Sequence, residues 1–139
     1  MIIPKSIEYQ IESHFFCYEE EKKQAEILER DIAEAITPNL DGVGGSGGIS
    51  DPTAQKAAQI EKETRSIRMW VDVVDATIKH FRATESEKAE FFKLHYVQLK
   101  SPPTAQIELN ISQPTFYRWR KDLLTYAALQ AAKAGLLEL

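Results

Sequence analysis

The sequence predicts an all-α protein in which a long N-terminal helical hairpin is joined to a C-terminal helix-turn-helix domain. Apolar residues recur at spacings of three and four over long stretches, and no segment shows the apolar–polar alternation of a half-buried strand. Five of the six glycines fall within residues 42–48, where they interrupt the helical pattern. These observations divide the chain into two long helices and a region of shorter ones.

The first predicted helix covers residues 6–36, which contain no glycine and no proline. Pro38 and a glycine-rich connector over residues 41–50 end it. Its apolar face has helical spacing and consists of Ile7, Ile11, Phe15, Tyr18, Ala25, Leu28, Ile32 and Ile36.

The second predicted helix begins at Pro52, with Ser50 or Asp51 as its N-cap. Its seam alternates steps of four and three, as in coiled coils, along Ile60, Thr64, Ile67, Val71, Val74, Ile78 and Phe81. We therefore expect this helix to fold back on the first, so that residues 1–83 form an antiparallel hairpin for oligomerisation or for contact with a protein partner.

Residues 84–139 contain signals for three shorter helices. Thr84 and Glu87 have the spacing of a capping box, which predicts a helix over residues 85–99. Its expected buried face comprises Phe92, His95 or Tyr96, and Leu99.

Two further helices follow. Ser101 is the expected N-cap of a short helix over residues 102–109. Ser112 caps the last helix, which is expected to run to about residue 134 and to stop at Gly135.

These last two helices have the pattern of a helix-turn-helix, which needs a tight turn with one residue in the left-handed region. Asn110 occupies the turn, where asparagine is the best substitute for glycine. The expected contacts between the helices are all apolar and involve Ala105, Leu109, Ile111, Phe116 and Trp119.

The outward face of the last helix supplies the candidate DNA-binding residues. Those expected to reach base edges in a major groove are Gln113, Thr115, Tyr117 and Arg118. The groups expected to contact phosphates are Lys121, Tyr117 and the capped helix N-termini at Ser101 and Ser112. Arg120 lies nearer the core side, where its stem is expected to pack along apolar surface.

The segment "ISQPTFYRWRKDLLTYAAL" (111–129), behind a short proline-punctuated helix, resembles the C-terminal domain of phage and prophage transcriptional regulators of the ArpU and RinA type, which is similar to region four of sigma factors. The glycine-rich loop before "SDPTAQKA" resembles the same family. The resemblance implies an activator of late phage genes that binds DNA near a promoter and acts with host RNA polymerase. It assigns DNA reading to Gln113, Thr115, Tyr117 and Arg118, and a core role to Phe116 and Trp119.

The net charge of −4 hides an asymmetry along the chain. Residues 1–41 carry ten acids and four bases, or −6, so residues 42–139 carry +2. The single Cys17 excludes an internal disulfide, and no leader peptide or membrane-spanning run is evident. We therefore expect a soluble protein in the cytoplasm of a bacterial host cell, with no membrane partner.

No other motif predicts a phosphate-binding, metal-binding or catalytic site. "GVGGSGG" lacks the Lys-Ser/Thr pair of a phosphate-binding loop, and His14 with Cys17 lacks a second pair of zinc ligands. No nucleophile, base and orienting acid can be assembled from motifs, so we expect no enzyme activity, no cofactor and no metal.

The sequence is also compatible with two other functions. A small terminase subunit also joins a helix-turn-helix to oligomerising helices, although its DNA-binding element usually comes first in the chain. A helical protein that does not bind DNA would use the acidic hairpin alone to bind a partner protein.

In the DNA-binding interpretation, one helix-turn-helix binds weakly, so a second copy of the chain, as in a homodimer, is expected to increase the affinity.

Overall fold

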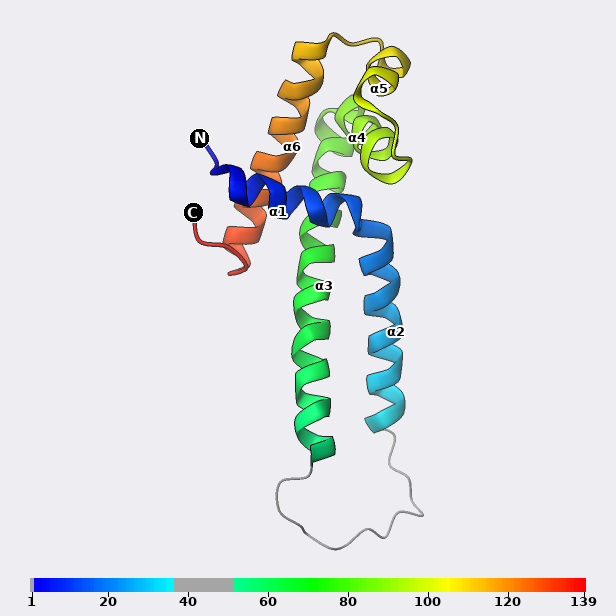
Figure 1. The fold of residues 1–139 in the computed structure, drawn as a ribbon, viewed down its shortest axis with the longest axis vertical. Helices are drawn as coiled ribbons and strands as arrows, with labels where there is room; N and C mark the ends of the chain where they lie inside the picture. The colour runs from blue at the N-terminus through cyan, green and yellow to red at the C-terminus, as the bar shows by residue number, and fades with distance from the viewer. Residues whose placement is uncertain (1, 37–51) are drawn as a thin grey trace, which may run out of the picture.

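The computed structural model describes residues 2–36 and 52–139, and every regular element in these ranges is a helix. The elements (Figure 1) are α1 (Lys5–Phe16), α2 (Tyr18–Ile36), α3 (Pro52–Thr84), α4 (Ser86–Phe92), the π-helical turn η1 (Lys93–Val97), α5 (Pro102–Leu109) and α6 (Gln113–Lys133). The predicted all-α class is confirmed. The predicted connector 41–50 and the caps Ser50 and Asp51 lie outside the described residues.

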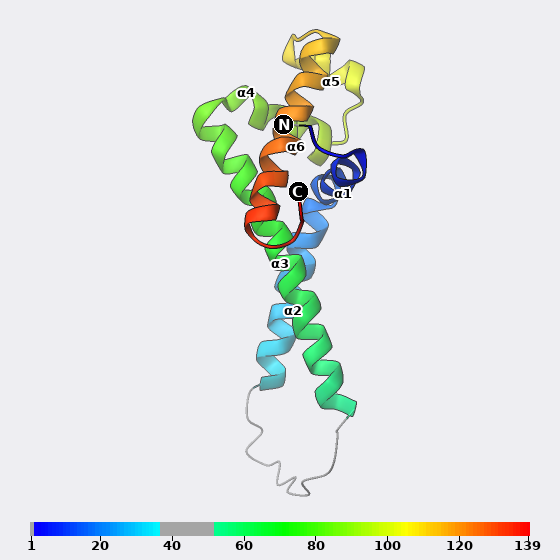
Figure 2. The same cartoon turned by 90° about the vertical axis from the view of Figure 1, so that its left-hand side faces the viewer.

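The helices form a long pair of rods with a compact group of helices at one end (Figures 1 and 2). α2 and α3 lie side by side in opposite directions, and the C-terminal end of α3 packs against α4 and α6. α1 crosses this group and contacts α6, η1 and α3. In the part of the chain that the structure describes, no helix is both long and apolar enough to span a bilayer.

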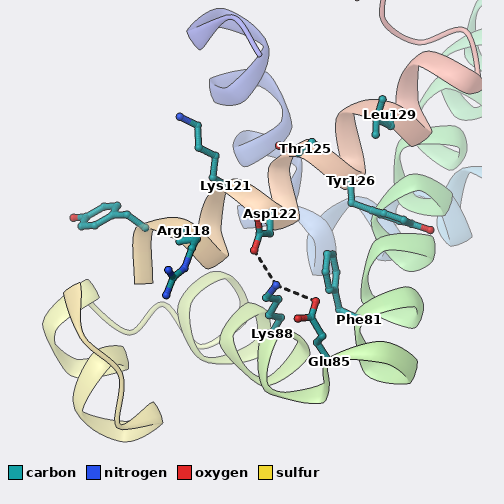
Figure 3. A pocket seen from close by; sticks show the side chains of 10 residues that line it. Phe81, Glu85, Lys88, Arg118, Lys121, Asp122, Thr125, Tyr126 and Leu129 are labelled. Carbon is teal, nitrogen blue, oxygen red and sulfur yellow. Dashed lines mark hydrogen bonds and ion pairs between the residues drawn. The ribbon is translucent and has the colours of Figure 1, made fainter. Parts of the chain in front are cut away.

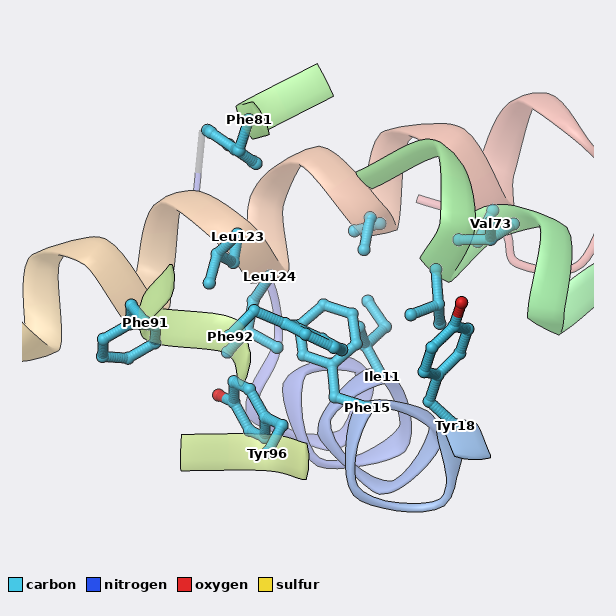
Figure 4. Close-up of a cluster of buried hydrophobic side chains, with 14 of the residues drawn as sticks. Ile11, Phe15, Tyr18, Val73, Phe81, Phe91, Phe92, Tyr96, Leu123 and Leu124 are labelled. Atoms are coloured by element: carbon cyan, nitrogen blue, oxygen red, sulfur yellow. The ribbon is translucent and has the colours of Figure 1, made fainter. Parts of the chain in front are cut away.

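The apolar core lies where α1, α3, α4, η1 and α6 meet (Figure 4). Phe15 and Phe92 pack edge to face with ring centroids 5.1 Å apart, and Phe91 and Phe116 do so at 4.8 Å. The largest fully buried side chains are Tyr96, Phe15, Phe91, Phe92, Phe116, Ile11, Leu123, Leu124, Val71, Val74 and Thr77. Residues on both sides of the predicted boundary at 83/84 therefore share one core.

The prediction of one helix over residues 6–36 is wrong, because the chain turns at Cys17. α1 buries Ile11 and Phe15 against the core, whereas α2 runs along α3. The His14 side chain bridges the turn, since its Nδ1 lies 2.9 Å from a Glu21 carboxylate oxygen. Tertiary packing bends a segment whose local sequence contains no helix breaker.

The predicted capping box is also wrong. Glu85 is the N-cap of α4 and makes no side-chain capping bond, and the Thr84 hydroxyl donates to the carbonyl of His80. The helix predicted to reach Leu99 ends at Val97 with the π-helical turn. Leu99 is 68% exposed with φ 57°, so its predicted burial is wrong, whereas Phe92 and Tyr96 are buried as predicted.

Candidate nucleic-acid interface

The turn between α5 and α6 has the backbone geometry that the sequence predicts. Asn110 caps α5 in the left-handed region, with φ 54° and ψ 50°. Ser101 caps α5 by accepting from the backbone N–H of Thr104 at 3.4 Å, and Ser112 caps α6 by accepting from that of Thr115 at 3.3 Å. These caps fix where each helix begins and therefore which side chains of α6 face outward.

The α5–turn–α6 unit is anchored to the core by its apolar residues. Ala105 and Phe116 are fully buried, and the partly buried side chains that pack against the core are Leu109, Ile111 and Trp119. Gly135 adopts φ 82° just beyond α6, and the N–H of Leu136 donates to the carbonyl of Ala131. The predicted end of this helix is thus confirmed.

The opposite side of α6 is open to solvent. Gln113, Tyr117, Arg118 and Lys121 are exposed, Tyr117 by 47%. None of these four is in an ion pair within the described ranges. Their side chains are available to a ligand.

Thr115 and the two capping serines are placed differently from these four residues. The half-buried Thr115 hydroxyl lies 2.9 Å from the Ser112 hydroxyl and accepts from Arg118 Nη2 at 3.1 Å. Thr115 therefore lies on the same face of α6 as Arg118 and also orients the Arg118 side chain. Ser101 is exposed at the start of α5 and bonds to Thr104.

An open groove of about 820 Å³ lies along this side of α6 (Figure 3), and we call it the α6 groove. It is lined by Phe81, Glu85, Lys88, Tyr117, Arg118, Lys121, Asp122, Thr125, Tyr126 and Leu129. In the close-up, Arg118 and Lys121 project from α6 without touching the ion pairs at the base of the groove.

A buried lysine partly neutralises the negative charge of the two carboxylates that line this groove. Lys88 Nζ lies 2.8 Å from Asp122 and 2.9 Å from Glu85, and its side chain is only 11% exposed. Burial alone would lower the pKa of Lys88, but the hydrogen bonds to Asp122 and Glu85 outweigh it and hold the pKa above its ordinary value. Lys88 therefore stays charged and joins α4 to α6. The role of Lys88 was not predicted from the sequence, because this residue, four positions after the predicted capping threonine, belongs to no motif.

The inner side of α6 is held by a second charge cluster. Arg120 Nε donates to Glu12 at 2.7 Å and Nη2 donates at 3.0 Å, while the Tyr96 hydroxyl donates to the same carboxylate at 2.8 Å. A Glu8 oxygen lies 4.0 Å from Arg120 Nη1. The predicted inward placement of Arg120 is confirmed, but its partner on α1 was not predicted because the two residues are 108 positions apart.

No protein-family model, curated protein or solved structure matches the chain. Within the described ranges, no group of three or more His, Cys, Asp or Glu residues is placed to hold a metal ion. The site is therefore interpreted from its own geometry, as an exposed face with basic, amide and phenol groups on an anchored helix.

Proposed function

We propose that the chain is a sequence-specific DNA-binding transcription regulator in which α5 and α6 act as a helix-turn-helix. The observation that supports the proposal is that α6 has an exposed polar side and a buried apolar side. Its N-terminal half exposes Gln113, Tyr117, Arg118 and Lys121, while its inner side is fixed in the core. A recognition helix needs both properties, because its N-terminal residues must reach base edges at a fixed angle.

In this proposal each exposed group has a role set by its chemistry. Arg118 presents a guanidinium suited to the O6 and N7 atoms of guanine, and Gln113 presents an amide suited to adenine. Lys121 and the Tyr117 hydroxyl meet phosphates, together with the amide ends of the helices capped by Ser101 and Ser112. Thr115 contributes mainly by orienting Arg118.

The proposal extends to activation of late phage genes together with host RNA polymerase, for which the support is the resemblance in residues 111–129. No enzyme activity and no cofactor are part of it. One helix-turn-helix contacts few phosphates, so a second copy of the chain bound to an adjacent half-site would raise the affinity.

The test starts with selection of duplexes from a random pool, followed by fluorescence anisotropy at low and moderate salt. We expect an enriched sequence, an affinity that falls with salt, and losses of about tenfold or more in Arg118→Ala and Tyr117→Ala. Lys62→Ala, an exposed site on α3, is the matched control. If the folded protein enriches no sequence and binds no duplex at low salt, the proposal fails.

A further inference from the structure

A second groove, of about 870 Å³, lies between the start of α2, the end of α3, α4 and η1. We call it the α2–α4 groove. It shares no lining residue with the α6 groove. On α4 its residues include Ser86, Ala89 and Glu90, whereas Lys88 turns to the other side of the helix. A molecule in this groove would leave the outer face of α6 free.

The base of the α2–α4 groove is apolar. Phe92 forms part of it, with Ile78, Ala89 and Val97, which pack on the core but are only partly buried. Tyr18 closes one wall by donating a hydrogen bond from its hydroxyl to Asp75. The groove is open to solvent, so apolar surface remains that a ligand could cover.

Basic side chains surround this apolar base. Lys79 and Arg82 on α3 and Lys93 on η1 are exposed, and no carboxylate of the described residues forms an ion pair with any of them. Lys22 on α2 completes the set and lies 5.7 Å from the centroid of the Tyr18 ring. Four bases thus line the groove of a chain whose net charge is −4.

We propose that the α2–α4 groove binds an acidic amphipathic helix of a partner protein. Apolar side chains of the partner at helical spacing would cover Ile78, Ala89 and Val97, and its flanking carboxylates would pair with Lys79, Arg82 and Lys93. A nucleic acid fits less well, because its backbone brings no apolar face. Glu19, Asp75 and Glu90 also line the groove, so the partner's carboxylates would be limited to positions beside the bases, whereas a continuous row of phosphates would also face these three acids.

The test uses the full chain and two labelled helical peptides of about 15 residues, a length that supports four turns. Both carry leucine or phenylalanine at i, i+3, i+4 and i+7; one has glutamate at the flanking positions and the other has lysine. We expect anisotropy to show binding of the glutamate peptide alone. Lys79→Glu combined with Arg82→Glu should weaken it about tenfold or more.

Lys56→Glu combined with Lys62→Glu, two exposed sites at the other end of α3, is the matched control and should bind like wild type. Circular dichroism confirms the fold of each variant. Arg118→Ala should keep full peptide affinity, which separates this groove from the proposed DNA function. Equal binding of the lysine peptide, no binding of the glutamate peptide, or indifference to Lys79→Glu with Arg82→Glu would overturn the proposal.

Two further outcomes assign the groove to another ligand. If the affinity for duplex DNA falls in Lys79→Glu with Arg82→Glu, the groove belongs to a nucleic-acid surface. If sedimentation shows a dimer of the wild type that these substitutions dissociate, the occupant is a second copy of the chain. Either result would also overturn the proposal of a partner helix.

Discussion

Arg118 and Arg120 are two positions apart on α6, but one side chain is exposed and the other is held in an ion pair. Arg118 lies in the α6 groove and is exposed, and within the described ranges its side chain bonds to Thr115 and to no acid. Arg120 points into the molecule and is held by Glu12 on α1. The contrast shows that a run of basic residues in a sequence need not all lie on a binding surface. A base that pairs with an acid in the folded protein is not available to a ligand, whereas an unpaired base is.

The largest expected effect is on the stability of the fold and follows from removing the acid that holds Arg120. Glu12→Ala leaves the guanidinium of Arg120 and the hydroxyl of Tyr96 without their carboxylate, and we expect unfolding free energy to fall by about 3 kcal/mol. Urea denaturation measures this change. The matched control is Glu29→Ala, which removes a more exposed partner of Arg68 and should cost much less, because solvent screens an exposed ion pair. Equal losses in the two variants would contradict the structural role of the cluster.

The same cluster predicts a dependence on pH. Burial would raise the pKa of Glu12, but hydrogen bonds from Arg120 and Tyr96 outweigh it and hold the pKa below its ordinary value of 4.5. A carboxyl whose pKa is lower in the folded state stabilises the fold above pH 4.5, and this contribution is lost as the pH falls toward the folded pKa.

Denaturation of wild type and Glu12→Gln from neutral to acidic pH tests this sign. The stability advantage of the wild type should shrink below pH 4.5. A difference between the two proteins that stays constant across the range would show that Glu12 makes no linked contribution.

A smaller effect is expected at the base of the α6 groove. Lys88→Met leaves Asp122 and Glu85 without their cation, and since both acids are partly solvated we expect a loss of about 1 kcal/mol. DNA affinity should also fall, because the groove gains uncompensated negative charge. Lys100→Met, which removes an exposed 3.8 Å pair with Glu108, is the control for stability and should change it little.

Effects no larger than this are expected at the two positive-φ residues, Asn110 and Leu99, and the smallest is at Leu99. Asn110→Ala should cost about 1 kcal/mol, because alanine tolerates the left-handed region poorly, and Asn110→Gly should not. Leu99→Gly should stabilise by about 0.5 kcal/mol, since the leucine is exposed and loses little packing. Thermal melts would measure both changes, and a destabilised Leu99→Gly would contradict this explanation.

The sequence predicted the features that depend on neighbouring residues. Ser101, Asn110, Ser112 and Gly135 define helix ends through local hydrogen bonds and backbone preferences, and all four are found in their predicted roles. The inward direction of Phe116 also follows from helical periodicity alone.

The features that were missed depend on residues far apart in the chain. The turn at Cys17 results from the packing of α1 across α6, and no glycine or proline marks it. The pairs Glu12–Arg120 and Lys88–Asp122 join positions 108 and 34 residues apart. Such pairs follow only from tertiary structure, which a single sequence read by local pattern does not provide.

The most direct test of the two-sided helix compares Arg118→Ala with Arg120→Ala in the same two assays. For Arg118→Ala we expect a melting temperature close to wild type and a loss of DNA affinity of about tenfold or more. Arg120→Ala should melt at a clearly lower temperature, because Glu12 loses its guanidinium partner. A folded Arg118→Ala protein that binds its selected duplex as tightly as wild type would contradict the assignment of this side of α6 to DNA.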